Sequence, residues 1–358
     1  MQTQDARFMA QALHLAERGR FTTDPNPSVG CVLVREGEVI AEGWTQRAGF
    51  AHAEIHALSQ IEDARDTTAY VTLEPCSHHG RTGPCCDALI KAGIRRVVVA
   101  MQDPNPLVCG QGLQRLRDAG VEVVCDVLRQ EAERLNRGFF KRMRQGLPWV
   151  VSKLAMSLDG RTAMASGESQ WITSSLARQD VQRFRAASSA ILTSIDTVLA
   201  DDPQLNARVD FDVVQPVKVV LDSQLRLPLS AKLLQHSIDT WIITCNEKSS
   251  KLQALREIGC KVFTVNADSG HVSLKEAFKL LAELHINSVW IEAGATLNGA
   301  LLESGLVDEW IIYMAPSVLG DEGRGLFHLP AMRKMADKKT LLLQDVRQIG
   351  PDIRMIFK

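Results

Sequence analysis

The sequence predicts an α/β protein built from two domains in succession, residues 1–146 and 147–358. The chain has 358 residues, enough for two ordinary domains that each bury a core. Strand and helix patterns alternate through the first range, and a second alternating series begins at Trp149. The hydrophobic content of 45% and charged content of 23% are typical of a soluble globular protein.

The first domain is expected to be an α/β/α sandwich. An amphipathic helix is expected at the N-terminus, where apolar residues recur at helical spacing: Phe8, Met9, Ala12, Leu13 and Ala16. Residues 28–44 predict two strands joined by a Glu-Gly turn. Further along, strands are expected at 69–75, 95–104 and 121–127, and helices at 52–61, 84–93 and 112–120.

The second domain follows a basic segment, 141–148, that contains Gly and Pro and is expected to be a linker. Strands are expected at 149–160, 190–203, 217–223, 240–245, 261–265 and 288–294. Helices are expected at 175–189, 273–286 and 295–306. The two halves show no internal repeat, so two different α/β domains and two sites are expected.

Composition argues against several classes of partner. The net charge of −1 gives no overall attraction to nucleic acid or membrane, and the aromatic content of 5% is low for stacking on single strands. The sequence has no apolar run of 18 residues and no signal-peptide pattern at its start. The eight cysteines have no paired spacing, as expected of reduced thiols, so the cytoplasm is the expected location.

Four residues of the first domain suggest a zinc site: His52, Glu54, Cys76 and Cys85. A hydrolytic zinc needs three protein ligands and an open position for water, and one imidazole with two thiolates meets that count. Glu54 would stay off the metal and carry protons. His52 and Glu54 can converge only if His52 lies at the start of its helix. Cys85 follows Pro84, which favours a helix N-terminus.

A structural zinc site is the alternative, with a fourth ligand from His56, His78 or His79. His56 is expected instead to pack within its helix, and a metalloprotease pattern is excluded because Ala53 stands where that pattern needs Glu. The spacer 77–84 carries His78, His79 and Arg81, which suits a phosphate-bearing substrate, or it is an exposed polar loop. The remaining cysteines are expected to be small core residues: Cys31, Cys86, Cys109, Cys125, Cys245 and Cys260.

A second candidate site lies at residues 291–302, which read as a strand, a Gly turn and a helix. Backbone N–H groups at such a helix start can hold a phosphate. The segment lacks the Gly patterns of nucleotide-hydrolysing loops and Rossmann folds, so on its own it is as well explained by a tight structural turn.

Several phrases together resemble a known family. PNPSVGCVLV (25–34), HAEIHAL (52–58), YVTLEPCSHHGRTGPC (70–85) and DPNPLVCGQGL (103–113) resemble the deaminase domain of bacterial bifunctional riboflavin-biosynthesis deaminase–reductases. KLAMSLDGRTA (153–163), GESQWIT (167–173), ILTSIDTVLADDPQLNAR (191–208) and IEAGATLNGALL (291–302) resemble the reductase domain of the same family. The resemblance implies a cytidine-deaminase-like domain followed by a dihydrofolate-reductase-like domain. Gly83 and Cys86 depart from the usual family residues but are not ligands.

The resemblance also implies roles for individual residues. The zinc ligands would be His52, Cys76 and Cys85, with Glu54 as proton shuttle. Positions implied to contact the dinucleotide are Ala155, Trp171, Thr197, Asp201, Ser223, Gly294, Ala295, Thr296, Leu297, Asn298, Gly299 and Ala300. Positions implied to contact substrate are Asn26, Ser169, Arg185, Leu205, Arg208 and Glu292, and His78 of the spacer loop is a further candidate from its residue type. The residue types fit these roles, because Arg185 and Arg208 can bind a phosphate in bidentate fashion and Glu292 can accept hydrogen bonds. Without the resemblance, Arg185 would be read as a solvated helix residue and Trp171 as a core or interface anchor.

The expected activity is two consecutive steps of riboflavin synthesis. Zinc-dependent hydrolytic deamination of 2,5-diamino-6-(ribosylamino)pyrimidin-4-one 5′-phosphate would come first, and NADPH-dependent reduction of the ribosyl side chain to ribityl second. Lys153 and Asp201 are candidates for handling protons during ring opening. A homodimer or homotetramer is expected, assembled through the reductase domains. The alternatives are a nucleic-acid deaminase fused to a nucleotide-binding module and a non-enzymatic zinc-stabilised protein; an unliganded Glu54 would argue against the last.

Overall fold

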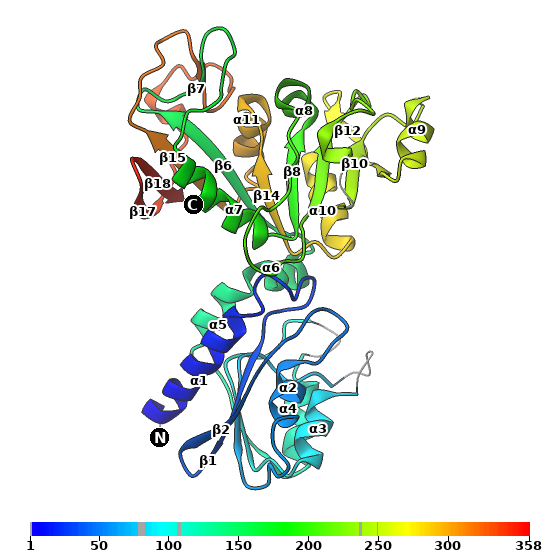
Figure 1. Cartoon of the computed structure of the whole chain (residues 1–358), viewed down its shortest axis with the longest axis vertical. Coiled ribbons are helices and arrows are strands. Elements are labelled where there is room, and N and C mark those ends of the chain that lie inside the picture. The colour runs from blue at the N-terminus through cyan, green and yellow to red at the C-terminus, as the bar shows by residue number, and fades with distance from the viewer. Residues whose placement is uncertain (1, 78–82, 106–108, 236–237, 249) are drawn as a thin grey trace. The chain divides into compact units, whose positions relative to one another are not determined.

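The computed structural model describes residues 2–77, 83–105, 109–235, 238–248 and 250–358. The chain divides into two compact units, each an α/β unit (Figure 1). The first contains residues 1–147 together with Asp212–Val214, and the second contains Pro148–Phe211 and Gln215–Lys358. No helix in the described ranges has the length and apolarity needed to span a membrane.

The first unit is a five-stranded sheet covered by helices on both faces. The strand order is β2-β1-β3-β4-β5, where β1 pairs antiparallel with both neighbours and the β3, β4 and β5 pairings are parallel. These strands are β1 (Gly30–Arg35), β2 (Glu38–Trp44), β3 (Thr68–Val71), β4 (Arg96–Val99) and β5 (Glu122–Val124). The helices are α1 (Gln2–Glu17), α2 (Ala53–Leu58), α3 (Cys85–Lys91), α4 (Gln111–Asp118), α5 (Arg129–Leu135) and α6 (Arg137–Gln145). Helix α1, with α5 beside it, covers one face, and α2, α3 and α4 cover the other (Figure 1). The predicted sandwich is therefore confirmed.

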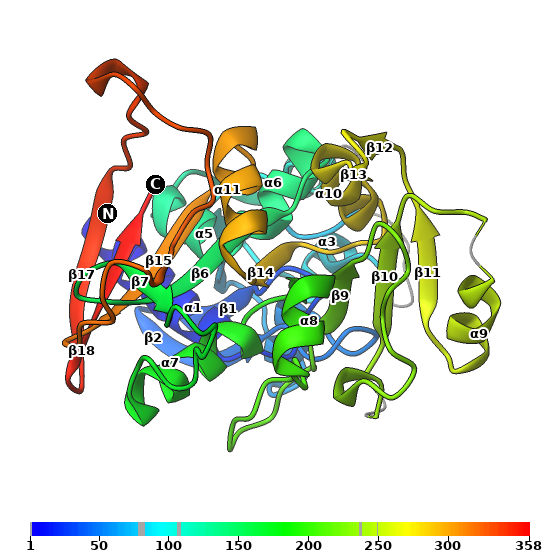
Figure 2. The same ribbon diagram turned by 90° about the horizontal axis from the view of Figure 1, so that it is seen from above.

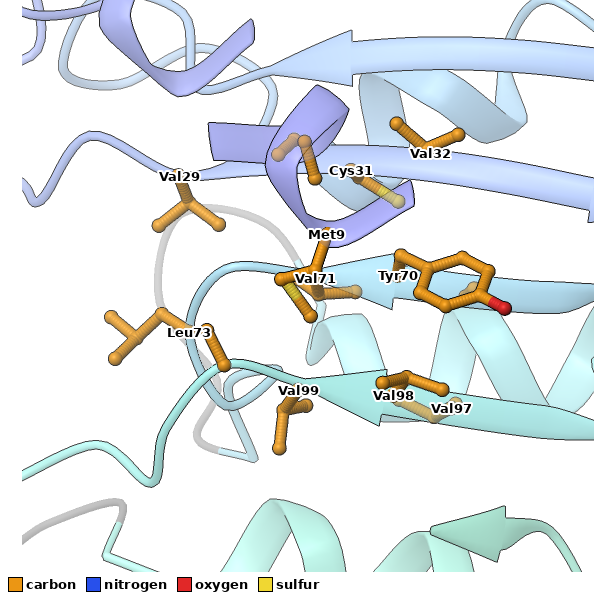
Figure 3. Close-up of a cluster of buried hydrophobic side chains, with 14 of the residues drawn as sticks. Met9, Val29, Cys31, Val32, Tyr70, Val71, Leu73, Val97, Val98 and Val99 are labelled. Atoms are coloured by element: carbon orange, nitrogen blue, oxygen red, sulfur yellow. The ribbon is translucent and has the colours of Figure 1, made fainter. Parts of the chain in front are cut away.

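Apolar side chains from the central strands fill the core of this unit. Figure 3 shows Val71 of β3 and Val97–Val99 of β4 beside Met9 of α1. Gly43 brings α2 close to the sheet, because a Cβ at Gly43 would lie 2.2 Å from the carbonyl oxygen of Ala53. The residue before Ala53 is His52, so this close approach helps to place the first residue of the predicted zinc site.

The second unit contains a nine-stranded sheet with the order β11-β10-β9-β8-β14-β6-β15-β18-β17. The first seven strands in this order run parallel, and β18 pairs antiparallel with both β15 and β17 (Figure 2). The strands are β6 (Trp149–Ser157), β8 (Ala190–Ser194), β9 (Val217–Leu221), β10 (Thr240–Thr244), β11 (Lys261–Thr264), β14 (Ser288–Glu292), β15 (Glu309–Ala315), β17 (Leu343–Ile349) and β18 (Asp352–Phe357). Short strands form two further pairs, β7 (Arg161–Ala163) with β16 (Arg324–Gly325) and β12 (Ala267–Asp268) with β13 (His271–Val272).

Helices and short 3₁₀ turns connect these strands. The helices are α7 (Ser175–Ala186), α8 (Ile195–Asp201), α9 (Lys251–Glu257), α10 (Leu274–Glu283) and α11 (Ala295–Ser304), and the 3₁₀ turns are η1 (Lys232–Leu234) and η2 (Met335–Asp337). Parallel strands joined by helices leave the loops after their carboxyl ends at one edge of the sheet, where binding sites of α/β folds are usually found.

One expected strand was wrong, the expected linker contains the boundary between the units but is largely helical, and three strands of the large sheet were missed. Residues 190–203, expected as one strand, are strand β8 followed by helix α8, because the Ser194 side chain accepts a hydrogen bond from the Thr197 N–H and caps a helix start. The linker expected at 141–148 is helical up to Gln145, and Gly146, with φ of 65°, ends that helix. Strands β15, β17 and β18 were not expected; β17 is mostly exposed, so its sequence lacks the alternation of a half-buried strand.

Candidate zinc site and cavity

Three possible metal ligands converge in the first unit. The ligand atoms of His52, Cys76 and Cys85 all lie within 4.8 Å of one another. His52 Nδ1 lies 3.6 Å from Cys76 Sγ and 3.3 Å from Cys85 Sγ. Two sulfurs and one imidazole nitrogen form a donor set that suits zinc, and a three-residue set leaves the fourth tetrahedral position for water. Among the described residues no fourth His, Cys, Asp or Glu joins this group.

Helix starts position two of these three side chains. His52 is the N-cap of α2, with extended backbone, as its convergence with Glu54 requires. Cys85 is the first residue of α3, directly after Pro84, and its N–H donates to Cys76 Sγ at 3.3 Å. Cys76 lies in the segment after β3, beyond the carboxyl end of a parallel strand.

The environment of the two sulfurs favours one thiolate. Hydrogen bonds from Cys85 and His52 lower the pKa of Cys76 to about 4, despite its burial. The contact with Cys76 and burial raise the pKa of Cys85. The hydrogen bond to Cys76 also raises the pKa of His52. A bound dication would favour deprotonation of both sulfurs, because thiolates are the form that ligates metal.

Glu54 lies in the first turn of α2 with 4% of its surface exposed. Burial, together with the nearby Cys76 thiolate, raises the pKa of Glu54 to about 7. A carboxyl group with a pKa near neutrality can both accept and release a proton at physiological pH. The structure therefore places a buried carboxyl group with a raised pKa in the helix turn that follows His52.

The structure also places two other residues that the sequence analysis considered for this site, His56 and Asn26. His56 packs edge-on against the Trp44 ring, with centroids 4.7 Å apart, and its Nδ1 lies 3.1 Å from Gln46 Nε2, so the expectation of a packed helix residue is confirmed. Asn26 is half-buried in the turn before β1, where its N–H donates to the Thr23 carbonyl. His78, His79 and Arg81 lie outside the described residues.

The cysteines outside the site were expected to lie in the core, which is confirmed for Cys31, Cys86 and Cys260. It was wrong for Cys109, which is exposed, and too strong for Cys125 and Cys245, which are half-buried. Cys109 directly precedes Gly110, whose φ of 80° turns the chain into α4, so its position at a surface turn explains the exposure.

Sequence reasoning missed Glu74, a buried carboxylate two residues before Cys76. Its two oxygens accept four backbone hydrogen bonds, from the N–H groups of Asp103, Gly110, Gly112 and Leu113 at 2.9–3.3 Å. Glu74 thus ties the segment before Cys76 to the loop that leads into α4. The Glu-Pro-Cys order was visible in the sequence, but nothing there indicated which backbone groups the carboxylate would bind.

The second unit contains a cavity of about 1230 Å³. It lies beyond the carboxyl ends of the parallel strands, since Ser194 at the end of β8, Ser223 after β9 and Glu292 at the end of β14 all line it. Twelve residues with predicted roles line this cavity: Lys153, Ala155, Ser169, Thr197, Asp201, Ser223, Glu292, Gly294, Ala295, Thr296, Leu297 and Ala300.

Other residues with predicted roles lie outside the cavity lining. Trp171 is 70% exposed, with the Arg178 guanidinium 4.5 Å from its ring centroid, and Leu205 is buried. The exposed Arg208 donates from Nη1 to Asn206 Oδ1 at 3.0 Å. Its pKa is lowered because its guanidinium is partly desolvated, although the residue as a whole is exposed, and because the Arg185 charge lies nearby.

Asn298 and Gly299 shape the start of α11 from behind the cavity. The fully buried Asn298 amide donates to the carbonyls of Ala293 and Gly294 and accepts from Ser152 Oγ at 2.6 Å. A Cβ at Gly299 would lie 1.9 Å from the His328 carbonyl oxygen. The Asn298 side chain therefore holds the turn rather than facing the cavity.

A buried charge cluster lies at the end of β14. Arg185 on α7 forms a two-pronged ion pair with Glu292, from Nε to Oε1 at 2.6 Å and from Nη2 to Oε2 at 2.9 Å. Its Nη1 donates to the Asn206 carbonyl. Burial alone would raise the pKa of Glu292, but Arg185, Lys153 and the Trp290 hydrogen bond outweigh it and lower the pKa to about 2. Burial lowers the pKa of Lys153 against the opposing Glu292 charge.

Sequence reasoning also missed the β12–β13 segment, whose Asp268, Ser269 and His271 line the cavity. The Val272 N–H donates to Ser223 Oγ at 3.0 Å, which ties this segment to the end of β9. The Asp-Ser-Gly turn predicts a tight reversal, but only the fold places it beside β9.

Comparisons with known proteins match both units of the chain. The model of the cytidine and deoxycytidylate deaminase zinc-binding region matches residues 2–101, and that of the RibD C-terminal domain matches residues 148–355. The chain is 52% identical to the riboflavin biosynthesis protein RibD of Escherichia coli over 363 aligned positions, covering 98% of each chain.

Solved structures give the same result. The chain superposes on RibD of Acinetobacter baumannii with a TM-score of 0.93 and 46% identity, covering 100% of this chain and 99% of that one. A Thermotoga maritima structure described as a diaminohydroxyphosphoribosylaminopyrimidine deaminase/5-amino-6-(5-phosphoribosylamino)uracil reductase gives a TM-score of 0.87 at 30% identity, with 100% and 99% covered. The zinc-binding deaminase region and the reductase domain predicted from sequence are confirmed by these matches. The chain belongs to the RibD family of bifunctional riboflavin-biosynthesis enzymes, with a deaminase region followed by a dihydrofolate-reductase-like domain.

Proposed function

We propose that this enzyme deaminates 2,5-diamino-6-(ribosylamino)pyrimidin-4-one 5′-phosphate and then reduces the ribosyl side chain of the product to ribityl with NADPH. The convergence of His52, Cys76 and Cys85 beside the buried Glu54 carries the first half of this proposal. The two activities named for the Thermotoga maritima relative support both halves. We assign the deamination to residues 1–146 and the reduction to residues 147–358.

For the deamination, we propose that His52, Cys76 and Cys85 hold a zinc ion and that Glu54 moves the proton. Bound zinc supplies a water that ionises near neutral pH. Glu54 takes a proton at its carboxylate as the oxygen of that water bonds to the amino-bearing ring carbon. It then gives the proton to the amino nitrogen, so that the carbon–nitrogen bond breaks and ammonia leaves. The raised pKa of Glu54 suits a group that exchanges protons in both directions.

We propose that Asn26, as the family resemblance implies, and His78 of the spacer loop contact the substrate in the deaminase site. A half-buried amide in a turn can both donate and accept hydrogen bonds to a ring edge, and an imidazole can donate to a phosphate. His78 itself lies outside the residues that the structure describes.

For the reduction, we propose that NADPH binds in the cavity of the second unit. The N–H groups at the start of α11, in the turn held by Asn298, favour binding of its diphosphate. Ala155, Trp171, Thr197, Asp201 and Ser223 are the proposed neighbours of the dinucleotide. Bound NADPH supplies the hydride, which goes to the sugar C1′ in its open form.

The remaining polar groups would bind and orient the sugar phosphate. We propose contacts from Ser169, Leu205, Arg208 and Glu292. Lys153 and Asp201 are the proposed proton donors and acceptors during ring opening, and burial lowers the pKa of Lys153, which favours proton release. Arg185 is engaged with Glu292 and Asn206, so we propose that it acts on the substrate chiefly through that carboxylate.

We also propose that the enzyme works in the cytoplasm as a homodimer or homotetramer assembled through the reductase units. All eight cysteines are unpaired, as in a reducing compartment. Strand β17 is an edge of the nine-stranded sheet; Leu343 and Val346 on it are 50% and 52% exposed, and Leu342 just before it is 68% exposed. Exposed apolar side chains on a free edge favour association with a second copy. Light scattering on the wild type and on Val346→Glu would test this, and a wild-type monomer would contradict it.

The decisive experiment follows the two half-reactions separately on purified protein. With the diaminopyrimidinone ribosylamine phosphate alone, we expect one equivalent each of ammonia and the deaminated pyrimidinedione, and no ribityl product. Addition of NADPH should produce one equivalent of cofactor oxidation per ammonia released. Ammonia release without cofactor oxidation would contradict the reductase assignment. Absence of ammonia release would contradict the deaminase assignment, and the reduction would then be assayed with the deaminated substrate.

A further inference from the structure

One indole N–H in the reductase unit reaches the charge cluster from outside the cavity lining. Trp290 lies on β14 with 1% of its surface exposed. Its Nε1 donates to Glu292 Oε1 at 2.7 Å. Residues two apart on a strand point to the same face, which is why the indole and the carboxylate can meet.

Because of this hydrogen bond, the two oxygens of the Glu292 carboxylate have different numbers of protein donors. Oε1 accepts from both Trp290 Nε1 and Arg185 Nε, whereas Oε2 accepts only from Arg185 Nη2 among the described groups. An ionised carboxylate oxygen has about two acceptor sites. Oε1 is therefore saturated by protein donors, and Oε2 keeps one acceptor site for a further donor.

The indole itself is held by stacked neighbours. The Phe184 ring lies parallel to it, with centroids 5.1 Å apart and an interplanar angle of 9°. The Arg354 guanidinium covers the Phe184 ring at 5.3 Å. Arg354 in turn donates to Asp180 Oδ2 at 2.7 Å, and the Tyr313 hydroxyl donates to the same oxygen at 2.6 Å. Such packing restricts the indole to one orientation.

We propose that Trp290 is a positioning residue for the reduction: its indole N–H occupies Glu292 Oε1 and so presents Oε2 to an O–H or N–H donor of the substrate. This inference rests on the proposed function, in which Glu292 contacts the substrate. With Arg185 as its only partner, the Glu292 carboxylate could rotate about the ion pair. A third hydrogen bond, from Trp290 on the same strand, removes that freedom.

The test is Trp290→Phe, which keeps an aromatic ring against Phe184 and removes the N–H. We expect kcat/KM for the pyrimidine substrate in the reduction to fall about tenfold, as for loss of a hydrogen bond to a charged group. The KM for NADPH should stay within about twofold of the wild type, because Glu292 is proposed to contact the substrate and not the dinucleotide. Ammonia release by the same protein should not change.

The matched control is Trp241→Phe. Trp241 is a buried tryptophan on β10 of the same sheet, and its Nε1 has no hydrogen-bond partner among the described residues. This variant loses the same atoms from the core without losing a hydrogen bond, so its reductase kinetics should match the wild type. Equal kinetics for Trp290→Phe and Trp241→Phe would overturn the proposal.

A double-mutant cycle separates positioning from a general effect on folding. In a Glu292→Gln background, Trp290→Phe should lower kcat/KM by clearly less than tenfold, because the group it acts through has changed. An undiminished tenfold loss there would overturn the proposal.

A second variant covers the case in which Trp290→Phe does not fold. Phe184→Leu weakens the stacking on the indole and keeps the indole N–H. It should lower the same parameter about threefold, and an unchanged value would count against the proposal. Wild-type protein that releases ammonia but oxidises no NADPH would contradict the proposed reduction itself.

Discussion

Glu54 is a carboxylate that lies beside the candidate zinc ligands His52, Cys76 and Cys85 and is not proposed to be a ligand itself. The H-x-E spacing and the two cysteines indicated this arrangement from sequence, because metal chemistry restricts the residue types that can serve. The Arg185–Glu292 pair and the Trp290 hydrogen bond were not predictable, since they depend on how α7 packs against β14. Sequence reasoning therefore finds ligands by their chemistry more readily than it finds the partners of a charged side chain.

Glu54→Gln should leave the zinc content nearly unchanged, because Glu54 is proposed to move protons rather than to bind the metal. Deamination should fall about 10²–10⁴-fold, as expected for loss of a general acid–base group. Metal analysis and ammonia release measured on one preparation check this. Near-normal deamination would show that another group moves the proton.

Arg208→Ala should raise the reductase KM for the pyrimidine substrate about ten- to a hundredfold, if Arg208 holds the substrate phosphate. A lost charge-assisted hydrogen bond contributes about 1.5–3 kcal/mol. Steady-state kinetics of the reduction check this, with ammonia release as the control. A loss of both activities in a folded protein would mean that the two sites are coupled.

At the scale of elements, α1 is joined to the first sheet by more than apolar packing. Asp5 of α1 accepts hydrogen bonds from Arg96 of β4 at 2.8 and 3.0 Å and from the Tyr70 hydroxyl of β3 at 2.9 Å. The helical periodicity of α1 was clear from sequence. The segment 190–203 was predicted as one strand because its apolar residues fit a strand, whereas Ser194 caps a helix within it. Element boundaries that depend on a single capping residue were therefore the hardest to predict from sequence.

Asp5→Asn should lower the free energy of unfolding at neutral pH by about 1.5–3 kcal/mol, since it removes a charged acceptor from a pair whose side chains are only 10–11% exposed. The hydrogen bonds from Arg96 lower the pKa of Asp5 below its ordinary value of 3.8. The stabilisation is thus present above pH 3.8 and disappears as the pH falls through the folded-state pKa. Urea unfolding of both proteins at several pH values checks this; a difference independent of pH would contradict it.

At the scale of the whole molecule, each unit carries its own candidate site. The repeated alternation of strands and helices was enough to predict two α/β domains, because each domain needs its own apolar pattern. The antiparallel edge formed by β17 and β18 was not predictable, because β17 buries too little surface to leave a pattern. The candidate zinc ligands and the cavity-lining residues come from separate units.

Removal of zinc with a chelator should therefore abolish deamination and leave the reduction of the deaminated substrate near its original rate. Ammonia release should return when zinc is added back. Assays of each half-reaction before and after chelation check this, and a parallel loss of both activities would contradict the division of labour between the units.

The four hydrogen bonds accepted by Glu74 have a consequence for the exchange of amide hydrogens with solvent. Loop amides usually exchange quickly because they open without unfolding the domain. The N–H groups of Asp103 and Gly110 lie in loop backbone, yet they point at a buried carboxylate. Deuterium labelling read out by mass spectrometry should therefore find slow exchange at these amides, and Glu74→Gln should make their exchange faster. The speed of a loop's isotope uptake would then report how firmly the Cys76 segment is held, without substrate, metal or any activity assay.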